Sequence, residues 1–122
     1  MSNSTIDIEI KDGQTSFLPG QTLGGIARWL CSEPPKKASL QLIWFTEGKG
    51  DEDVGLVEEI KFENPYVSDE RPFKFQLPGR PYSFSGKLIS LTWALELQVD
   101  HECVRKEIVL SPSGNEIMLT GT

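Results

Sequence analysis

The 122-residue sequence holds one histidine and two cysteines, and this shortage excludes a metal cluster built from histidine or cysteine ligands. Basic residues are also few, 12 against 18 acidic ones, which gives a formal net charge of −6. Proteins that bind nucleic acids or anionic membranes usually present a basic face, so we expect neither partner. No apolar run approaches the ~20 residues needed to cross a bilayer, so we expect no integral membrane segment.

The N-terminal residues, MSNSTIDIEI, lack the basic and apolar regions of a secretory signal, which favours a cytoplasmic protein. Disulfide bonds are rare in the cytosol, so we expect Cys31 and Cys103 to be two reduced, packed thiols. If they were instead bridged, the long closed loop would stabilise the fold by about 4 kcal/mol. The sequence indicates no cofactor.

We find no convincing helix, internal repeat or low-complexity segment; eight prolines and eleven glycines separate β-branched and aromatic runs. The longest pattern runs from Ile89 to Val99, where every odd position is apolar and the even positions are mostly polar. Successive side chains of a strand point to opposite faces, so this spacing predicts a strand with one face in a core. We expect the rest of the chain to pack around this strand.

Turn signals recur along the chain at intervals of roughly 8–12 residues. Residues 39–46 are apolar on both faces, so we expect a central or doubly covered strand, whereas residues 66–70 are predicted to be loop. Gly24 and Gly25, inside a predicted strand, indicate a bulge or a close backbone crossing. The pattern predicts an all-β sandwich of roughly seven to nine strands, forming one domain over residues 1–122. Besides 89–99, the predicted strands are 5–10, 16–18, 22–31, 39–46, 54–62, 72–77, 104–110 and 116–120.

Two blocks of the sequence resemble segments of a known family. Phe17 to Gly25, FLPGQTLGG, resembles the F-x-PG-x-x-(V/L)-x-G opening of arrestin-like N-terminal domains. Residues 73–86, FKFQLPGRPYSFSG, resemble the family's F-x-F-x-LP … P-x-S-(F)-x-G segment, and the strand that follows has Trp93 at the family's aromatic position. The blocks occur in the family's order, and the resemblance spans nearly the whole chain. The family includes arrestins, retromer-subunit relatives and bacterial sporulation-control relatives.

The resemblance implies an immunoglobulin-like, antiparallel β-sandwich that acts as an adaptor and not as an enzyme. Members of the family typically carry two such sandwiches, whereas this sequence covers one. The interdomain polar core and receptor-phosphate sensor of true arrestins cannot be assigned to residues here, so we infer no phosphoreceptor binding. A lone sandwich could form a homodimer in place of its missing second domain, or bind a protein through an exposed edge strand.

We therefore expect a non-catalytic interaction or scaffold module whose protein partner the sequence does not identify. The candidate binding residues belong to an exposed connection in which two consecutive prolines prevent a regular strand. The alternative explanation for this connection is protection of a sheet edge against aggregation. The candidate residues are Pro34, Pro35, Lys36 and Lys37.

The competing hypothesis is a ligand-binding sandwich directed at carbohydrate. Exposed Trp29, Trp44 and Trp93 would supply a stacking platform, and a calcium ion bound by Asp51 and Asp53 would stabilise the fold. All three tryptophans lie on predicted strands among apolar neighbours, which favours core packing. The acidic run does not match the EF-hand loop, which favours a solvated loop tip.

Catalysis is the third hypothesis. His101 and Cys103 lie two positions apart and could share a strand face, as a base and a nucleophile would. Sequence neighbours of this kind rarely have the geometry for proton transfer, so we favour a turn histidine beside a packed thiol. The lone histidine also disfavours a hydrolase triad. We expect no catalytic residues.

Overall fold

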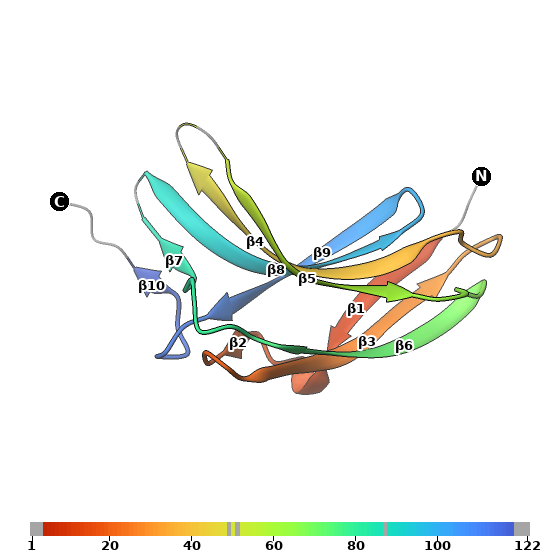
Figure 1. The fold of residues 1–122 in the computed structure, drawn as a ribbon, viewed down its shortest axis with the longest axis horizontal. Helices are drawn as coiled ribbons and strands as arrows, with labels where there is room; N and C mark the ends of the chain where they lie inside the picture. The colour runs from red at the N-terminus through yellow and green to blue at the C-terminus, as the bar shows by residue number, and fades with distance from the viewer. Residues whose placement is uncertain (1–3, 49, 51, 87, 119–122) are drawn as a thin grey trace.

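The computed structural model describes residues 4–48, 50, 52–86 and 88–118. Within these ranges the chain forms β-strands and one short 3-10 turn in two packed layers, as Figure 1 shows. None of these elements is a helix long and apolar enough to span a membrane. The elements are β1 (Thr5–Ile10), η1 (Lys11–Gly13), β2 (Ser16–Phe17), β3 (Thr22–Leu30), β4 (Ala38–Gly48), β5 (Val54–Phe62), β6 (Ser68–Gln76), β7 (Phe84–Ser85), β8 (Ile89–Val99), β9 (Glu102–Leu110) and β10 (Ile117–Met118).

Two sheets make up the sandwich. The smaller sheet has the strand order β1-β3-β6 and is antiparallel throughout. The larger sheet has the order β10-β7-β8-β4-β5. β8 pairs with β4 along one edge and with β9 along the opposite edge. β7 pairs with the beginning of that same edge, and β2 extends the sheet by pairing in parallel with β9. This arrangement confirms the predicted all-β sandwich, with β8 in a central position.

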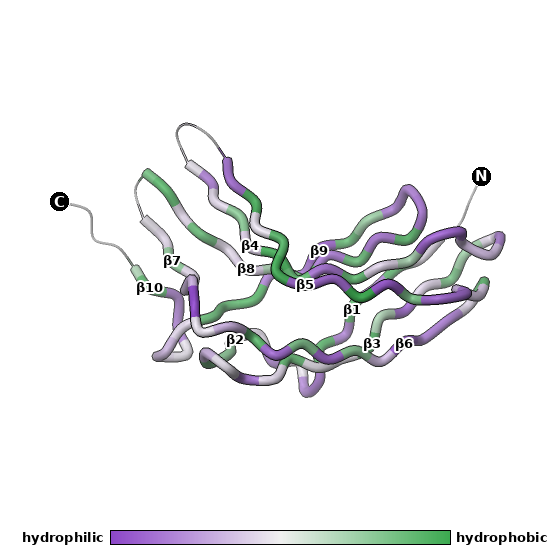
Figure 2. Tube along the Cα trace, in the orientation of Figure 1, coloured by the Kyte–Doolittle hydropathy of each residue, from purple (hydrophilic) through white to green (hydrophobic). Residues whose placement is uncertain are grey.

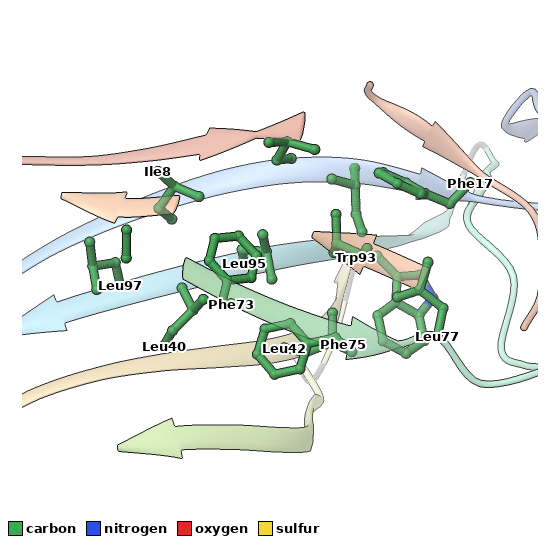
Figure 3. Packing of buried hydrophobic residues seen from close by; sticks show 14 of the residues in the cluster. Ile8, Phe17, Leu40, Leu42, Phe73, Phe75, Leu77, Trp93, Leu95 and Leu97 are labelled. Atoms are coloured by element: carbon green, nitrogen blue, oxygen red, sulfur yellow. The ribbon is translucent and has the colours of Figure 1, made fainter. Parts of the chain in front are cut away.

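The core lies between the two sheets and follows the alternation of β8. The odd positions of β8 from Leu91 to Val99 are all buried, with at most 6% of each residue exposed. Figure 3 shows Leu40 and Leu42 of β4 beside Phe73 of β6 in this core. Burial of each such side chain stabilises the fold by about 1.5–3 kcal/mol. Ile89, at the beginning of β8, departs from the pattern because it is 43% exposed.

β4 lies between β8 and β5, which confirms the central position, one of the two alternatives predicted for residues 39–46. Leu40 and Leu42 face the core. On the opposite face Ile43 and Phe45 are only 4% and 6% exposed, and they form a second buried cluster with Ala94 of β8. The apolar residues of both faces are therefore used in packing.

β6 begins earlier than the sequence predicts, so the expected loop at residues 66–70 is wrong in its second half. Ser68 already pairs with Leu30 at the end of β3, and the pairing continues in register to Gln76. Pairing with β3 outweighs the polar composition of this segment. Pro72 is tolerated within β6 because this strand forms an edge of the smaller sheet.

The two adjacent glycines of β3 have different surroundings. A Cβ added to Gly25 would lie 2.1 Å from the carbonyl oxygen of Glu9 and 2.8 Å from Cζ of Phe73, so only glycine fits there. At Gly24 the nearest atom, the carbonyl oxygen of Phe73, would be 3.6 Å away, which is an ordinary contact. β3 also pairs in continuous register with both β1 and β6. The predicted close crossing is confirmed, and the alternative of a bulge in β3 is wrong.

A polar contact holds the connection that leads from β5 in one sheet to β6 in the other. The Arg71 guanidinium donates to Oδ1 of Asp69 at 3.0 Å and lies 2.9 Å from Oδ2. Arg71 also donates to the backbone carbonyl groups of Glu63 and Asn64. The hydrogen bond from Arg71, helped by one from the backbone N–H of Tyr66 and opposed by burial, lowers the pKa of Asp69 below its ordinary value. A charged pair therefore fixes the junction of the two layers.

Candidate protein interaction site

A free edge of the larger sheet is formed by β5, which pairs with β4 on one side and, among the described residues, with no strand on the other. Its first half carries Val54, Leu56 and Val57, which are 65%, 57% and 41% exposed. Figure 1 shows this half following β4 in a hairpin that projects beyond the smaller sheet. Exposed apolar side chains on an unpaired strand edge are typical of sites where a partner adds a strand.

The backbone of this half is oriented for pairing. The N–H of Thr46 donates to the carbonyl oxygen of Asp53 at 2.9 Å, so these residues form a hydrogen-bonded pair of the hairpin. Such pairs alternate with non-bonded pairs along an antiparallel ladder, and Val54 and Leu56 occupy the non-bonded positions. Their N–H and C=O groups therefore point away from β4, toward the open edge.

The side chains of Val54 and Leu56 extend an apolar patch that begins on β4. Directly opposite residues of a strand pair share one face, which places them beside Phe45 and Ile43 on the outer face of the larger sheet. The guanidinium of Arg105 covers Phe45, with its Cζ 4.6 Å from the ring centroid. Two hydrogen bonds to one carboxylate oxygen of a β8 glutamate hold this guanidinium in place. The patch is therefore buried toward β8 and exposed toward the edge of β5.

Two features determine the shape of this edge. Gly55 lies against the indole of Trp44, because an added Cβ would be only 2.2 Å from its Cε2. The register between β4 and β5 shifts between Leu42 and Ile43, so that β5 has one extra residue, Val57, at this point. A bulge bends a strand and increases its twist, and Figure 1 shows β5 changing direction along its length. The bend separates the exposed first half of β5 from its second half, which packs on the core.

Acidic residues flank this apolar stretch on both sides. From Glu47 to Glu59 the sequence holds six carboxylates and a single lysine, a formal charge of −5 against −6 for the whole chain. In the part of the chain that the structure describes, only Glu59 among these carboxylates forms a salt bridge, at 3.9 Å from Lys61. Figure 2 shows the apolar stretch of β5 in green between hydrophilic segments. The edge therefore combines an apolar centre with negatively charged flanks.

The binding residues predicted from the sequence lie at the opposite end of the larger sheet. Pro34, Lys36 and Lys37 are exposed, whereas Pro35 is buried. The backbone N–H groups of both lysines donate to Oδ1 of Asp100, at 2.9 and 3.0 Å, which ties the segment to the turn between β8 and β9. The segment therefore presents two lysine side chains from a fixed backbone, and its role in protein binding stays a prediction.

The histidine and the cysteines show no arrangement that activates a nucleophile. His101 lies in the turn between β8 and β9, as predicted. Both cysteines are free; Cys31 is half-buried against the core and Cys103 is exposed, so the prediction of a packed thiol is wrong for Cys103. Partial desolvation raises the pKa of both thiols, and at Cys103 the carboxylate of Glu96 raises it further. A reactive cysteine needs a lowered pKa.

The tryptophans form no open platform. Trp29 and Trp93 are 2% and 0% exposed, and Trp44 is half-buried against the backbone of β5. The indole N–H of Trp29 donates to the carbonyl oxygen of Tyr66 at 2.9 Å, and that of Trp93 donates to Pro81 at 2.8 Å. The predicted core packing is confirmed, and the carbohydrate hypothesis loses the exposed indoles on which it depends.

The calcium hypothesis depends on Asp51, which lies outside the described residues, and on Asp53. The backbone N–H of Asp53 donates to Oγ1 of Thr46 at 2.9 Å, which closes the hairpin. Within the described ranges, no group of three or more histidine, cysteine, aspartate or glutamate side chains is placed to hold a metal ion.

A hollow of about 660 Å³ lies on the outer face of the smaller sheet. Gly24, Gly25 and Ile26 line it, and Pro72 and Lys74 contribute from the neighbouring strand. No histidine, cysteine or hydroxyl side chain is among its lining residues. The edge of β5 is the stronger candidate because its polar groups and its apolar side chains are presented together.

Sequence reasoning predicts the strand at residues 54–62 and misses its place at the edge of the sheet. Periodicity identifies the residues of a strand, whereas the order of strands depends on partners that are distant in sequence. A usable signal is present nonetheless: the apolar stretch 54–57 lies between the acidic runs 51–53 and 58–59.

No family model and no curated protein matches this chain. Among solved structures the chain is similar to Spo0M, a sporulation control protein from Bacillus subtilis, with a TM-score of 0.63 and 15% sequence identity. The match covers 88% of this chain and 49% of Spo0M, so the chain spans about half the length of that protein. Two structures of a β-glucosidase from Listeria innocua, one with gluconolactone, match 94% of this chain and 17% of theirs at 12% identity, with TM-scores of 0.48 and 0.46. These TM-scores are too low to support a conclusion about the fold or function of this chain.

The likeness to Spo0M concerns the fold. Bacterial sporulation-control proteins are among the relatives that the sequence resemblance names, and the described strands form the sandwich that it implies. The chain therefore has the arrestin-like β-sandwich fold that its motifs at residues 17–25 and 73–86 predict.

Proposed function

We propose that residues 1–122 form a single, non-catalytic interaction module that holds a partner protein by adding a strand of the partner to the free edge of β5. One observation carries the proposal: Val54 and Leu56 present free backbone groups and exposed apolar side chains at the same edge. In such complexes main-chain hydrogen bonds provide affinity, and alternate side chains provide specificity.

Two further observations support an adaptor role. The fold resembles part of Spo0M, whose description as a sporulation control protein denotes regulation. The raised pKa values of Cys31 and Cys103 leave both thiols protonated at neutral pH, which disfavours cysteine-based catalysis. An adaptor that acts by contact with another protein agrees with the likeness to a regulatory protein and with the unreactive thiols.

The test compares the wild-type chain with Val54→Pro. The N–H of Val54 faces the open edge, so proline there removes an outward donor and leaves the hydrogen bonds between β4 and β5 in place. Proteins captured from the source cells are purified and titrated against both forms. We expect Val54→Pro to weaken binding by about tenfold or more, as expected for the loss of a main-chain hydrogen bond.

Val54→Thr is the matched control, because threonine keeps the N–H and the β-branched shape and should retain most of the affinity. Circular dichroism and urea unfolding verify that both variants are folded. Equal binding by wild-type and folded Val54→Pro contradicts the proposal, as does the absence of any protein that binds in purified form. Binding lost only when Lys36 and Lys37 are both changed to alanine would move the site to the predicted lysine segment.

A further inference from the structure

We propose that the segment accepted by β5 is extended, apolar at its centre, and rich in lysine or arginine on both sides of that centre. This inference rests on the proposed function, because it specifies the partner of the same edge. It follows from the length of the open edge, from the side chains beside it and from the distribution of charge around it.

The open edge is short. The exposed first half of β5 runs from Val54 to Val57, where the bulge redirects the strand. At about 3.3 Å per residue, this length pairs with roughly four residues of a partner. Alternate side chains of those residues would lie on the outer face beside Val54 and Leu56, where the patch shared with Phe45 is apolar. The centre of the partner segment should therefore carry aliphatic or aromatic residues at every second position.

The charges around the open edge select the residues on either side of that centre. Glu52 and Asp53 precede the pairing stretch, and Glu58 and Glu59 follow it. Partner residues beyond the paired stretch would lie beside these carboxylates, where opposite charges are favourable and like charges are unfavourable. The formal charge of −5 on residues 47–59 would also speed the approach of a cationic segment at low salt.

A second copy of this chain fits the edge less well. A two-fold axis would place Val54 of each copy opposite Leu56 of the other, because the backbone groups of these two residues point outward. That register sets Glu52 of each copy opposite Glu58 of the other and brings two hairpins of formal charge −5 together. Like charges at both ends of the pairing oppose a homodimer here, so the observed charges favour a cationic segment of a different protein.

Two fluorescent peptides test the inference. One carries Val-Thr-Val-Thr between two lysines on each side, and the other has glutamates in place of the lysines. Each is titrated with the full chain and followed by anisotropy at low and at physiological ionic strength. We expect the lysine peptide to bind at least about tenfold more tightly than the glutamate peptide, and its affinity to fall as salt screens the charges.

Variants separate strand addition from general charge attraction. Val54→Pro leaves the charge unchanged and should abolish the specific binding of the lysine peptide. Glu52→Gln combined with Glu58→Gln keeps the edge and should narrow the difference between the two peptides. Glu47→Gln removes an exposed carboxylate of the same hairpin that lies on β4, away from the open edge, and should change the affinity much less.

Each remaining outcome distinguishes this inference from the proposed function. Lysine-peptide binding that persists in folded Val54→Pro would reflect charge attraction alone and would overturn the inference. Equally tight binding of the glutamate peptide that is lost in Val54→Pro would refute the preference for cations and leave edge binding intact. If no peptide binds in a Val54-dependent way, the inference fails and the edge function loses support. Self-association of the wild-type chain in light scattering, lost in Val54→Pro, would identify a second copy as the occupant.

Discussion

The two halves of β5 both contain apolar residues and have opposite environments. In the second half Ile60 and Phe62 pack on the core, and the Phe62 ring lies 5.7 Å from that of Trp29 in the smaller sheet, measured between centroids. In the first half Val54 and Leu56 are more than half exposed. The bulge at Val57 is the reason: the even positions of β5 face the core after the bulge and the outer side of the larger sheet before it.

This difference shows that one extra residue can turn the same spacing of apolar residues from the core face of a sheet to its outer face. Apolar residues that are turned to the outer face at the edge of a sheet remain as a surface that another molecule can contact. The two halves should therefore respond very differently to the same kind of substitution.

The largest expected effect is the contrast between Leu40→Ala and Leu56→Ala. Leu40 is 0% exposed and lies opposite Ile60 in the covered half, so its truncation should cost about 2–5 kcal/mol of the free energy of unfolding. Leu56 is 57% exposed, so the same truncation should change stability by no more than about 0.5 kcal/mol. Urea unfolding followed by tryptophan fluorescence measures both. Similar losses would show that the hairpin is packed in solution, which would contradict the comparison.

Much of the fold follows from local pattern. The alternation from Ile89 to Val99 predicts the strand and its buried face, because side-chain direction along a strand is a local property. The apolar faces of residues 39–46 likewise predict a central or doubly covered strand. The pairing of Ser68 with Leu30 has no local signal, since it depends on β3 approaching from a distant part of the sequence. Strand order is unpredictable for the same reason.

The candidate site is harder to predict than the fold. Residues 34–37 are predicted as a binding segment from their composition, because consecutive prolines and lysines are unusual in a strand. Val54 and Leu56 look like ordinary core positions. Two features make them a surface: the bulge turns them to the outer face, and no further strand lies beside β5 in the described structure. Composition identifies an unusual segment, whereas a binding edge is defined by what the rest of the chain leaves unpaired.

The two adjacent glycines of β3 should respond differently to the same substitution. Gly25→Ala should lower the free energy of unfolding by about 1–3 kcal/mol, because its Cβ would lie 2.1 Å from the carbonyl oxygen of Glu9 and force the strands apart. Gly24→Ala, the matched control, has room for a methyl group and should change stability by less than about 1 kcal/mol, in either direction. Thermal unfolding compares the two. Equal effects would mean that β1 and β3 do not approach as closely as described.

The second half of β5 leads into the polar contact between Arg71 and Asp69. We expect the loss of this contact to have the smallest effect on stability. Asp69→Asn weakens the charged hydrogen bonds from Arg71 and should cost about 1 kcal/mol at neutral pH. The folded-state pKa of Asp69 is lowered, so its contribution is fully present above the unfolded value of about 3.9 and is lost as the pH falls through the folded value. The stability difference between wild-type and Asp69→Asn should therefore be constant near neutrality and shrink below about pH 4.

Chemical denaturation of both proteins from pH 7 to about pH 3 measures this difference. Asp7→Asn removes the charge of an exposed aspartate on β1 and, as the control, should change stability at pH 7 by less than about 0.5 kcal/mol. If the difference for Asp69→Asn stayed constant to the lowest pH, its carboxylate would not be the group that Arg71 stabilises. The junction of the two sheets would then depend on the contacts of Arg71 with the backbone carbonyl groups of Glu63 and Asn64.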